Sequence, residues 1–252
     1  MFMDALWVAY NIPRLYLPPV EAYRAAALTK VLPIFDDLEQ EADAVAEAEF
    51  ERLCTQPATP DFHGGLSDLA ERATEYGQEY GETMFAIRQS VLNLLAAGLH
   101  HLFEQQQKGL FYQTVAARTG TEYRWKTLKP SLLASGVVWT RLPGAASLEE
   151  LRLAANTIKH GAGDSAAELA AVRPDLFGLD PDGNRETDVE RQRLGAAMQA
   201  SDLLFAPLGG GDLHVAERDL ADWCDAVLQF WRGLAAALRK LHSPESELPF
   251  DH

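Results

Sequence analysis

The feature that most constrains the fold is an apolar repeat, in steps of three and four residues, that extends over about ten helical turns. Its members are Leu66, Leu69, Ala73, Tyr76, Tyr80, Met84, Ile87, Val91, Leu94, Gly98 and Leu102. Residues at this spacing share one face of an α-helix. The repeat therefore predicts a helix over 65–107, either one long helix or two nearly collinear ones, that buries this face. Gly77 and Gly81 lower helix propensity in its middle, where we expect a bend.

A second core helix is predicted over 19–53. Pro18 and Pro19 suit the first turn of a helix, where the missing amide hydrogens have no intrahelical partner anyway. Pro33 should kink or break this helix, because proline removes a backbone donor and its ring clashes with the preceding turn. The apolar repeat then resumes opposite an acidic face, so the helix should continue beyond the break.

Two more core helices are predicted over 147–160 and 214–241. The first should begin with a capping box, in which Ser147 and Glu150 bond each other's backbone amides, and should end at Gly161 in a left-handed conformation. The second carries the apolar members Val215, Leu220, Trp223, Val227, Phe230, Trp231, Leu234, Leu238 and Leu241. Both patterns are typical of amphipathic helices that bury one side.

The remaining segments carry weaker signals. We expect an insertion over 108–146 in which a β-hairpin can form, an irregular connection over 178–211 and a loose tail over 243–252. Strand signals are few elsewhere. The sequence therefore predicts a single all-α domain over 1–252, a helical bundle built from long amphipathic helices with an irregular, hairpin-containing insertion.

Composition limits the class of protein more than its activity. The 252 residues are 47% hydrophobic and 23% charged, which is ordinary for a globular protein. No apolar run approaches the roughly 18 to 20 residues that cross a bilayer, so no membrane association is expected. The N-terminus lacks the features of a signal peptide, and two cysteines suit a reducing compartment. We therefore expect a cytoplasmic protein.

The charge is unevenly distributed along the chain. The net charge of −15 opposes nonspecific attraction to nucleic acid. Residues 36–51 contain eight acidic side chains and no basic one, whereas Lys108–Arg141 contains six basic side chains and one acidic one. The acidic helix 36–51 is either a solvated face or a docking surface for a basic protein partner.

The most informative polar pattern is in ELRLAANTIKHG, at the end of the helix predicted over 147–160. Arg152, Asn156 and His160 follow one another at four-residue spacing and Lys159 flanks them, so the four share one edge of the helix. This set could bind a phosphate, with Arg152 as a bidentate donor, Lys159 as a point charge, His160 as a proton carrier and Asn156 as an orienting amide. The alternative is an ordinary helix C-terminus, which favours cations for electrostatic reasons alone.

A second polar pattern lies on the long helix. His100 and Glu104 are one turn apart, with His101 adjacent, and Arg88 and Asn93 lie on the same helix before Gly98. The histidine and carboxylate could be half of a metal site, a buried hydrogen-bonded pair or catalytic groups. Because no second motif of this kind occurs in the sequence, we predict no metal and assign Arg88, Asn93, His100 and Glu104 a supporting role.

A third pattern alternates aromatic and basic side chains at Tyr123, Arg124, Trp125 and Lys126. Such alternation can stack bases while neutralising phosphates, as sites for single-stranded nucleic acid do. Cation–π packing inside the fold produces the same string. We treat these four residues as candidates for contact with RNA.

Together, a helix that reads R-x4-N and then LHHLFEQQ, followed by a helix that reads R-x3-N-x2-KHG, resembles bacterial HEPN-type proteins (higher eukaryotes and prokaryotes nucleotide-binding). The similarity covers about residues 65–165 and the final helix. Members of that superfamily are helical bundles, frequently dimeric, and many are toxins or antiviral effectors. Many are also metal-independent RNases whose Arg and His lie on one helix. The spacing here is longer than usual, with seven residues between Arg152 and His160, and several members are noncatalytic.

The resemblance implies an endoribonuclease that needs no cofactor and acts in a defence or toxin–antitoxin setting. Arg152, Asn156, Lys159 and His160 would be its catalytic residues, RNA its substrate and a homo-oligomer its assembly. The first alternative is a noncatalytic helical component that docks with a protein partner through the acidic helix 36–51. The second is a helical metal-dependent hydrolase around His100, His101 and Glu104.

Overall fold

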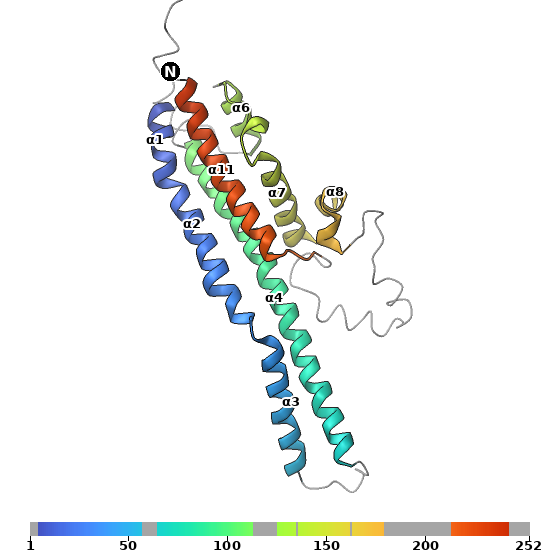
Figure 1. The fold of residues 1–252 in the computed structure, drawn as a ribbon. Helices are drawn as coiled ribbons and strands as arrows, with labels where there is room; N and C mark the ends of the chain where they lie inside the picture. The colour runs from blue at the N-terminus through green and yellow to red at the C-terminus, as the bar shows by residue number, and fades with distance from the viewer. Residues whose placement is uncertain are drawn as a thin grey trace, which may run out of the picture.

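The chain is an all-α helical bundle. A computed structural model describes residues 5–56, 65–112, 125–134, 136–161, 163–178 and 213–241, and these residues contain no β-strand. The α-helices are α1 (Ala5–Leu15), α2 (Leu17–Ala26), α3 (Leu38–Thr55), α4 (Leu66–Phe111), α6 (Trp125–Ala134), α7 (Ala145–His160), α8 (Asp164–Val172) and α11 (Glu217–Leu241) (Figure 1). The irregular connection 178–211 and the tail 243–252 lie, apart from Gly178, outside the described residues. The described helices include none that is long and apolar enough to cross a membrane.

The core forms around α11, which packs on α1, α2, α4 and α7. Aromatic rings fill its centre: the Trp231 ring stacks on Tyr16 at 4.6 Å, and Phe230 meets the edge of Phe103 at 5.3 Å. Gln106 satisfies two buried groups here, because its amide donates to the Tyr16 carbonyl and its oxygen accepts from Trp231 Nε1. The predicted apolar face of this helix is confirmed except at Leu241, which is exposed.

The predicted break at Pro33 is confirmed. The helix opens at Leu17 with both prolines in its first turn, passes through a π-helical turn (Ala27–Val31) and a 3₁₀ turn (Leu32–Phe35), and resumes as α3. Proline cannot donate its backbone amide, so the regular hydrogen-bond ladder ends here. The predicted first core helix is therefore two helices joined by a π-helical turn and a 3₁₀ turn.

The long helix α4 is confirmed, but its predicted buried face is wrong along much of its length. Ala73 is buried, whereas Leu66, Tyr76, Ile87 and Leu94 are exposed. Beyond residue 90 the helix instead buries the face that packs on α11 and α7. These four members of the repeat therefore lie on a surface that the described helices leave exposed.

The helix α4 continues without a break through Gly77 and Gly81. These glycines let α3 approach closely: a Cβ atom at Gly77 would lie 2.7 Å from both the carbonyl oxygen of Ala42 and the Cβ of Ala46. Together with the start of α4, α3 forms an arm that extends away from the bundle (Figure 1). We call α3 and residues 66–83 of α4 the arm.

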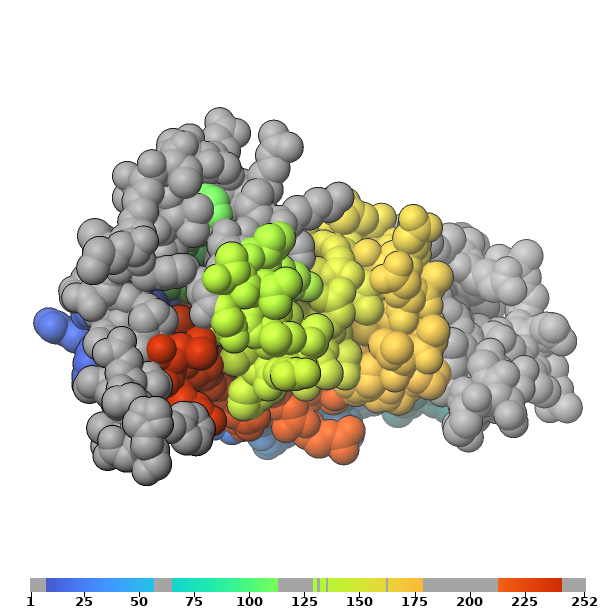
Figure 2. Space-filling model, turned by 90° about the horizontal axis from the view of Figure 1, so that it is seen from above, coloured from blue at the N-terminus to red at the C-terminus, as the bar shows by residue number. Residues whose placement is uncertain are grey.

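Two local predictions between α4 and α8 need correction. The capping box at Ser147 is absent, because α7 begins earlier, at Ala145, after Gly144 at φ +78°. This glycine lies against the Ala226 carbonyl of α11, where a side chain would clash. The hairpin predicted within 108–146 is not found in the described part of that segment, where α6 and a 3₁₀ turn (Trp139–Arg141) form instead. Figure 2 shows α6, α7 and α8 following one another across one face of the molecule.

Candidate functional site

The polar edge of α7 forms as the sequence predicts. Leu148, Leu151, Ala155 and Ile158 are buried in the core, so the opposite edge faces outward. Asn156 is half-buried there, and Lys159 and His160 are exposed. The helix ends at Gly161 as predicted, and the amide of this glycine donates to the Thr157 carbonyl. The predicted left-handed conformation is wrong: φ is positive at +71°, but ψ is −142°, outside the left-handed helical region.

His100 of α4 lies against this edge. His100 is only 6% exposed, its Nδ1 is 3.7 Å from a Glu104 carboxylate oxygen, and that nitrogen has no hydrogen-bond partner among the described residues. Burial lowers the pKa of His100, the charge of Glu104 opposes this, and the charges of Lys159 and Arg152 lower it further. The two polar patterns, which are about 50 residues apart in the sequence, therefore form one cluster where α4 packs on α7.

Arg152 is already engaged by carboxylates. Its Nε and Nη2 donate to one oxygen of Glu149, at 2.9 Å and 2.7 Å, and Nη2 lies 3.9 Å from Glu168 on α8. A phosphate could reach the guanidinium only by competing with these two acids. By contrast, no hydrogen bond joins the Asn156 side chain to any other described residue. The edge thus combines a guanidinium paired with carboxylates, an amide, an exposed lysine and an exposed histidine.

The predicted supporting residues Arg88 and Asn93 lie elsewhere. Arg88 pairs with Glu217 at the start of α11. Asn93 is fully buried, where its amide donates 2.9 Å to the Leu213 carbonyl and its oxygen accepts from the Val215 amide at 3.3 Å. These contacts hold the segment that enters α11 against α4. Their role in this structure is to position a helix.

The remaining candidates fall partly outside the described residues. Tyr123 and Arg124 lie there entirely, and Trp125 and Lys126 begin α6 without a described side chain. In the part of the chain that the structure describes, no three His, Cys, Asp or Glu side chains are grouped so that they could hold a metal ion. His100 and Glu104 therefore stand there as a pair of side chains.

Sequence reasoning missed the carboxylates that surround Arg152. Glu149 precedes it by three residues, a spacing at which helical side chains meet, so this contact was visible in the sequence. Glu168 comes from a different helix and was not. Comparison with protein-family models, with curated proteins and with solved structures finds no match to this chain.

Proposed function

We propose that the chain is an endoribonuclease of the HEPN type, which binds an RNA phosphate at the polar edge of α7. The observation that carries the proposal is the cluster formed by His100, Glu104, Arg152 and Lys159 at the packing of α4 on α7. The charges of Arg152 and Lys159 on α7 act on the buried imidazole of α4, and the exposed His160 follows Lys159 at the end of α7. The arrangement supports the phosphate-binding role that the resemblance assigns to these residues.

The reaction is transfer of the phosphodiester to the neighbouring 2′-hydroxyl. The 2′-oxygen bonds to phosphorus, the bond from phosphorus to the 5′-oxygen breaks, and the 2′-proton is removed while the leaving oxygen gains one. His160 moves the proton, because an exposed imidazole is the group on this edge suited to proton transfer near neutral pH. Lys159 and Arg152 stabilise the charge on the phosphoryl oxygens, and Asn156 orients the strand.

RNA cleavage in the presence of a chelator tests the proposal. Purified full-length chain is incubated with labelled single-stranded RNA, beside a His160→Ala variant and a His101→Ala control. We expect the His160→Ala variant to cleave at least about 100-fold more slowly, the scale of a lost proton-transfer group. The control should match the unmodified chain, because His101 is exposed on α4, where its Nε2 lies 3.4 Å from the side-chain amide of Gln105. Equal cleavage by the His160→Ala variant, or no cleavage by any form, would contradict the proposal.

A second experiment tests the carboxylate of Glu168 that lies near the Arg152 guanidinium. If an RNA phosphate competes with Glu168 for the guanidinium, a Glu168→Gln variant should bind RNA more tightly, with a larger effect at low salt. Glu71→Gln, a change of equal charge on the arm, is the matched control. Unchanged RNA affinity in the Glu168→Gln variant would remove Arg152 from the phosphate site.

The same acids favour a second candidate function, a noncatalytic helical component. A guanidinium held by Glu149 and Glu168 is partly neutralised, which suits a structural ion pair better than an anion site. In this function the acidic helix 36–51 docks with a basic protein partner. It predicts that neither cleavage nor RNA binding will depend on His160 or Glu168.

A further inference from the structure

A group of basic side chains lies at the end of the bundle where α1 begins and α11 ends (Figure 1). The two helices pack on each other, and Arg239 joins them. Its Nη2 donates 3.1 Å to the Ala9 carbonyl, and its guanidinium lies over the Tyr10 ring, 5.1 Å from the ring centre. Arg14 follows Tyr10 by four residues on the same face of α1, and Lys240 follows Arg239. We call Tyr10, Arg14, Arg239 and Lys240 the basic patch.

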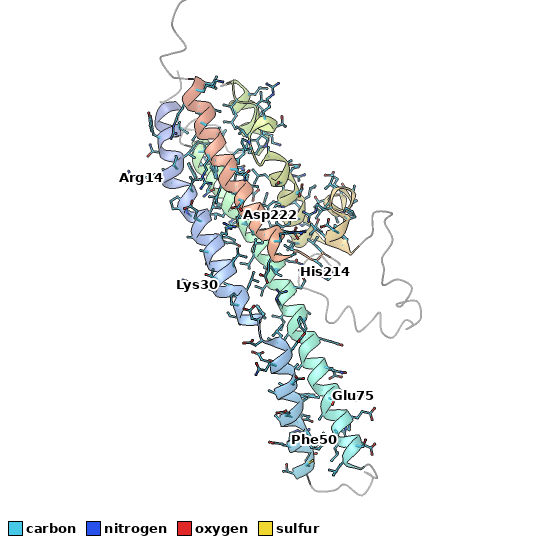
Figure 3. All side chains as sticks on the ribbon, in the orientation of Figure 1. Arg14, Lys30, Phe50, Glu75, His214 and Asp222 are labelled. Carbon is cyan, nitrogen blue, oxygen red and sulfur yellow. The ribbon has the colours of Figure 1, made fainter. Side chains whose placement is uncertain are left out.

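The positive charge of the basic patch is not balanced within its own helices. Neither α1 nor residues 233–241 of α11 contain an Asp or a Glu. Arg14 and Lys240 are exposed, and neither forms an ion pair with a described residue. Figure 3 shows Arg14 in the bundle, well away from Glu75 on the acidic arm. In a chain with a net charge of −15, the basic patch is therefore a region of local positive potential.

Tyr10 gives the basic patch an aromatic ring that is both exposed and restrained. The residue is 68% exposed, although it belongs to a helix that packs on the core. The Arg239 guanidinium over the ring is a cation–π contact, which favours one orientation of the tyrosine. With the cation on one face of the ring, the opposite face is open to a planar ligand. The ring and the three cations around it thus combine a stacking surface with positive charge.

We propose that the basic patch binds single-stranded nucleic acid, with one base stacked on Tyr10 and the neighbouring phosphates held by Arg14 and Lys240. Unpaired bases stack on aromatic side chains whatever their sequence, while arginine and lysine neutralise the backbone. The proposal goes beyond the endoribonuclease function, because none of these residues belongs to the polar edge of α7. Binding at the basic patch therefore does not require that the chain cleave RNA.

An anionic membrane also attracts basic side chains, but the surface around the basic patch suits it less well. A helix that lies in a membrane surface places a continuous apolar face in the lipid. The helix α1 instead buries Val8 and Ile12 in the core. The exposed apolar side chains beside the patch are single leucines, Leu15 at 45% and Leu241 at 44% exposure. An exposed aromatic ring among cations therefore favours a nucleic acid strand over lipid.

Fluorescence anisotropy of the full-length chain with short labelled strands of DNA and of 2′-O-methyl RNA tests the proposal. Neither strand has a free 2′-hydroxyl, so binding is measured without the cleavage proposed above. We expect dissociation constants of about 1–100 μM at about 50 mM salt. Tyr10→Leu should weaken binding at least about 5-fold through lost stacking. The double variant Arg14→Gln/Lys240→Gln should reduce the slope of log affinity against log salt by about 1.4, whereas Lys30→Gln, an exposed lysine on the π-helical turn, should leave it unchanged.

Photo-cross-linking locates the bound strand. A DNA strand that carries 5-iodouracil should cross-link to the peptide that contains Tyr10, and circular dichroism checks that each variant keeps its helix content. Binding of either strand supports the proposal, and the tighter of the two shows which sugar the basic patch prefers. Three results would overturn it: no binding up to about 100 μM, binding unchanged by Tyr10→Leu and Arg14→Gln, or binding to phosphatidylserine vesicles but to neither strand.

Discussion

At the scale of single residues, Arg173 joins α7 to α11 through ion pairs. Its guanidinium donates to Asp175 at 2.9 Å and 2.7 Å, to Asp219 of α11 at 2.7 Å and to Glu150 of α7 at 3.3 Å. The hydrogen bonds that Arg173 donates to Asp175, followed by the one to Asp219, raise the pKa of Arg173, and the hydrogen bonds from Arg173 lower the pKa of Asp175. Asp219 is only 5% exposed, and its two carboxylate oxygens accept from Arg173 at 2.7 Å and from the Ala216 amide at 3.0 Å.

Replacing Arg173 should therefore lower the stability of the folded chain. We expect Arg173→Met to lower the free energy of unfolding by about 2–3 kcal/mol, because it leaves the buried Asp219 carboxylate without its cation. Arg52→Met is the control: Arg52 makes a similar bidentate contact with Glu49, but on the exposed arm, so its loss should change stability much less than the loss of Arg173. Urea unfolding of both variants measures the difference, and equal effects would contradict it.

His100 should make stability depend on pH. Burial lowers the pKa of His100 below that of an unfolded histidine, so the unfolded chain binds the proton more readily. Its contribution to stability is therefore fully present above about pH 6.5 and is lost as the pH falls from there through the folded pKa. We expect a His100→Gln variant to lose less stability between pH 7 and pH 5 than the unmodified chain. A His101→Gln variant should lose as much as the unmodified chain. Urea unfolding at both pH values measures this, and identical losses would contradict it.

At the scale of elements, the arm depends on close approach of two helix backbones. Gly77 faces the Ala42 backbone, where a Cβ would lie at 2.7 Å, whereas a Cβ at Gly81 would lie 3.3 Å from the Ala42 side chain. The first contact cannot be relieved without moving a helix, and the second needs a shift of a few tenths of an ångström. A methyl group at Gly77 would therefore disturb the packing of α3 on α4 more than one at Gly81.

Alanine substitutions should separate these two positions. Alanine gains up to about 1 kcal/mol of helix propensity over glycine. We expect Gly81→Ala to be neutral or stabilising, whereas Gly77→Ala should destabilise the arm by about 1–3 kcal/mol through overpacking. Thermal unfolding followed by circular dichroism measures both. A Gly77→Ala variant as stable as the Gly81→Ala variant would contradict this expectation.

At the scale of the whole molecule, stability should be unequal between the bundle and the arm. In the bundle, α11 buries Trp223, Phe230 and Trp231, whereas the arm buries little more than Leu38 and Leu53 besides small residues. Regions with few buried apolar contacts open locally before the whole chain unfolds. We expect amide hydrogens of α3 to exchange at least about 100-fold faster than those in the middle of α11. Hydrogen exchange with mass spectrometry measures this, and equal protection would contradict it.

The sequence by itself determined the helices and their ends wherever a local signal decides them. The repeat over 66–102, the break at Pro33, the helix end at Gly161 and the apolar face of α11 all follow from backbone chemistry and side-chain spacing. It also determined which side chains share the polar edge of α7, because helical spacing alone fixes that. These features need no knowledge of the neighbouring elements.

Only the tertiary structure decided which faces meet. The spacing of apolar residues predicted that Tyr76 and Leu94 are buried, but both are exposed. The fold buries Gly77 instead, because α3 packs on α4 through small residues. A contact between small residues leaves no signal in the hydrophobic pattern. Likewise, His100 meets α7 and Glu168 meets Arg152 across helices that are distant in the sequence. Contacts of this kind depend on how whole helices pack, a property of the assembled molecule that no local pattern encodes.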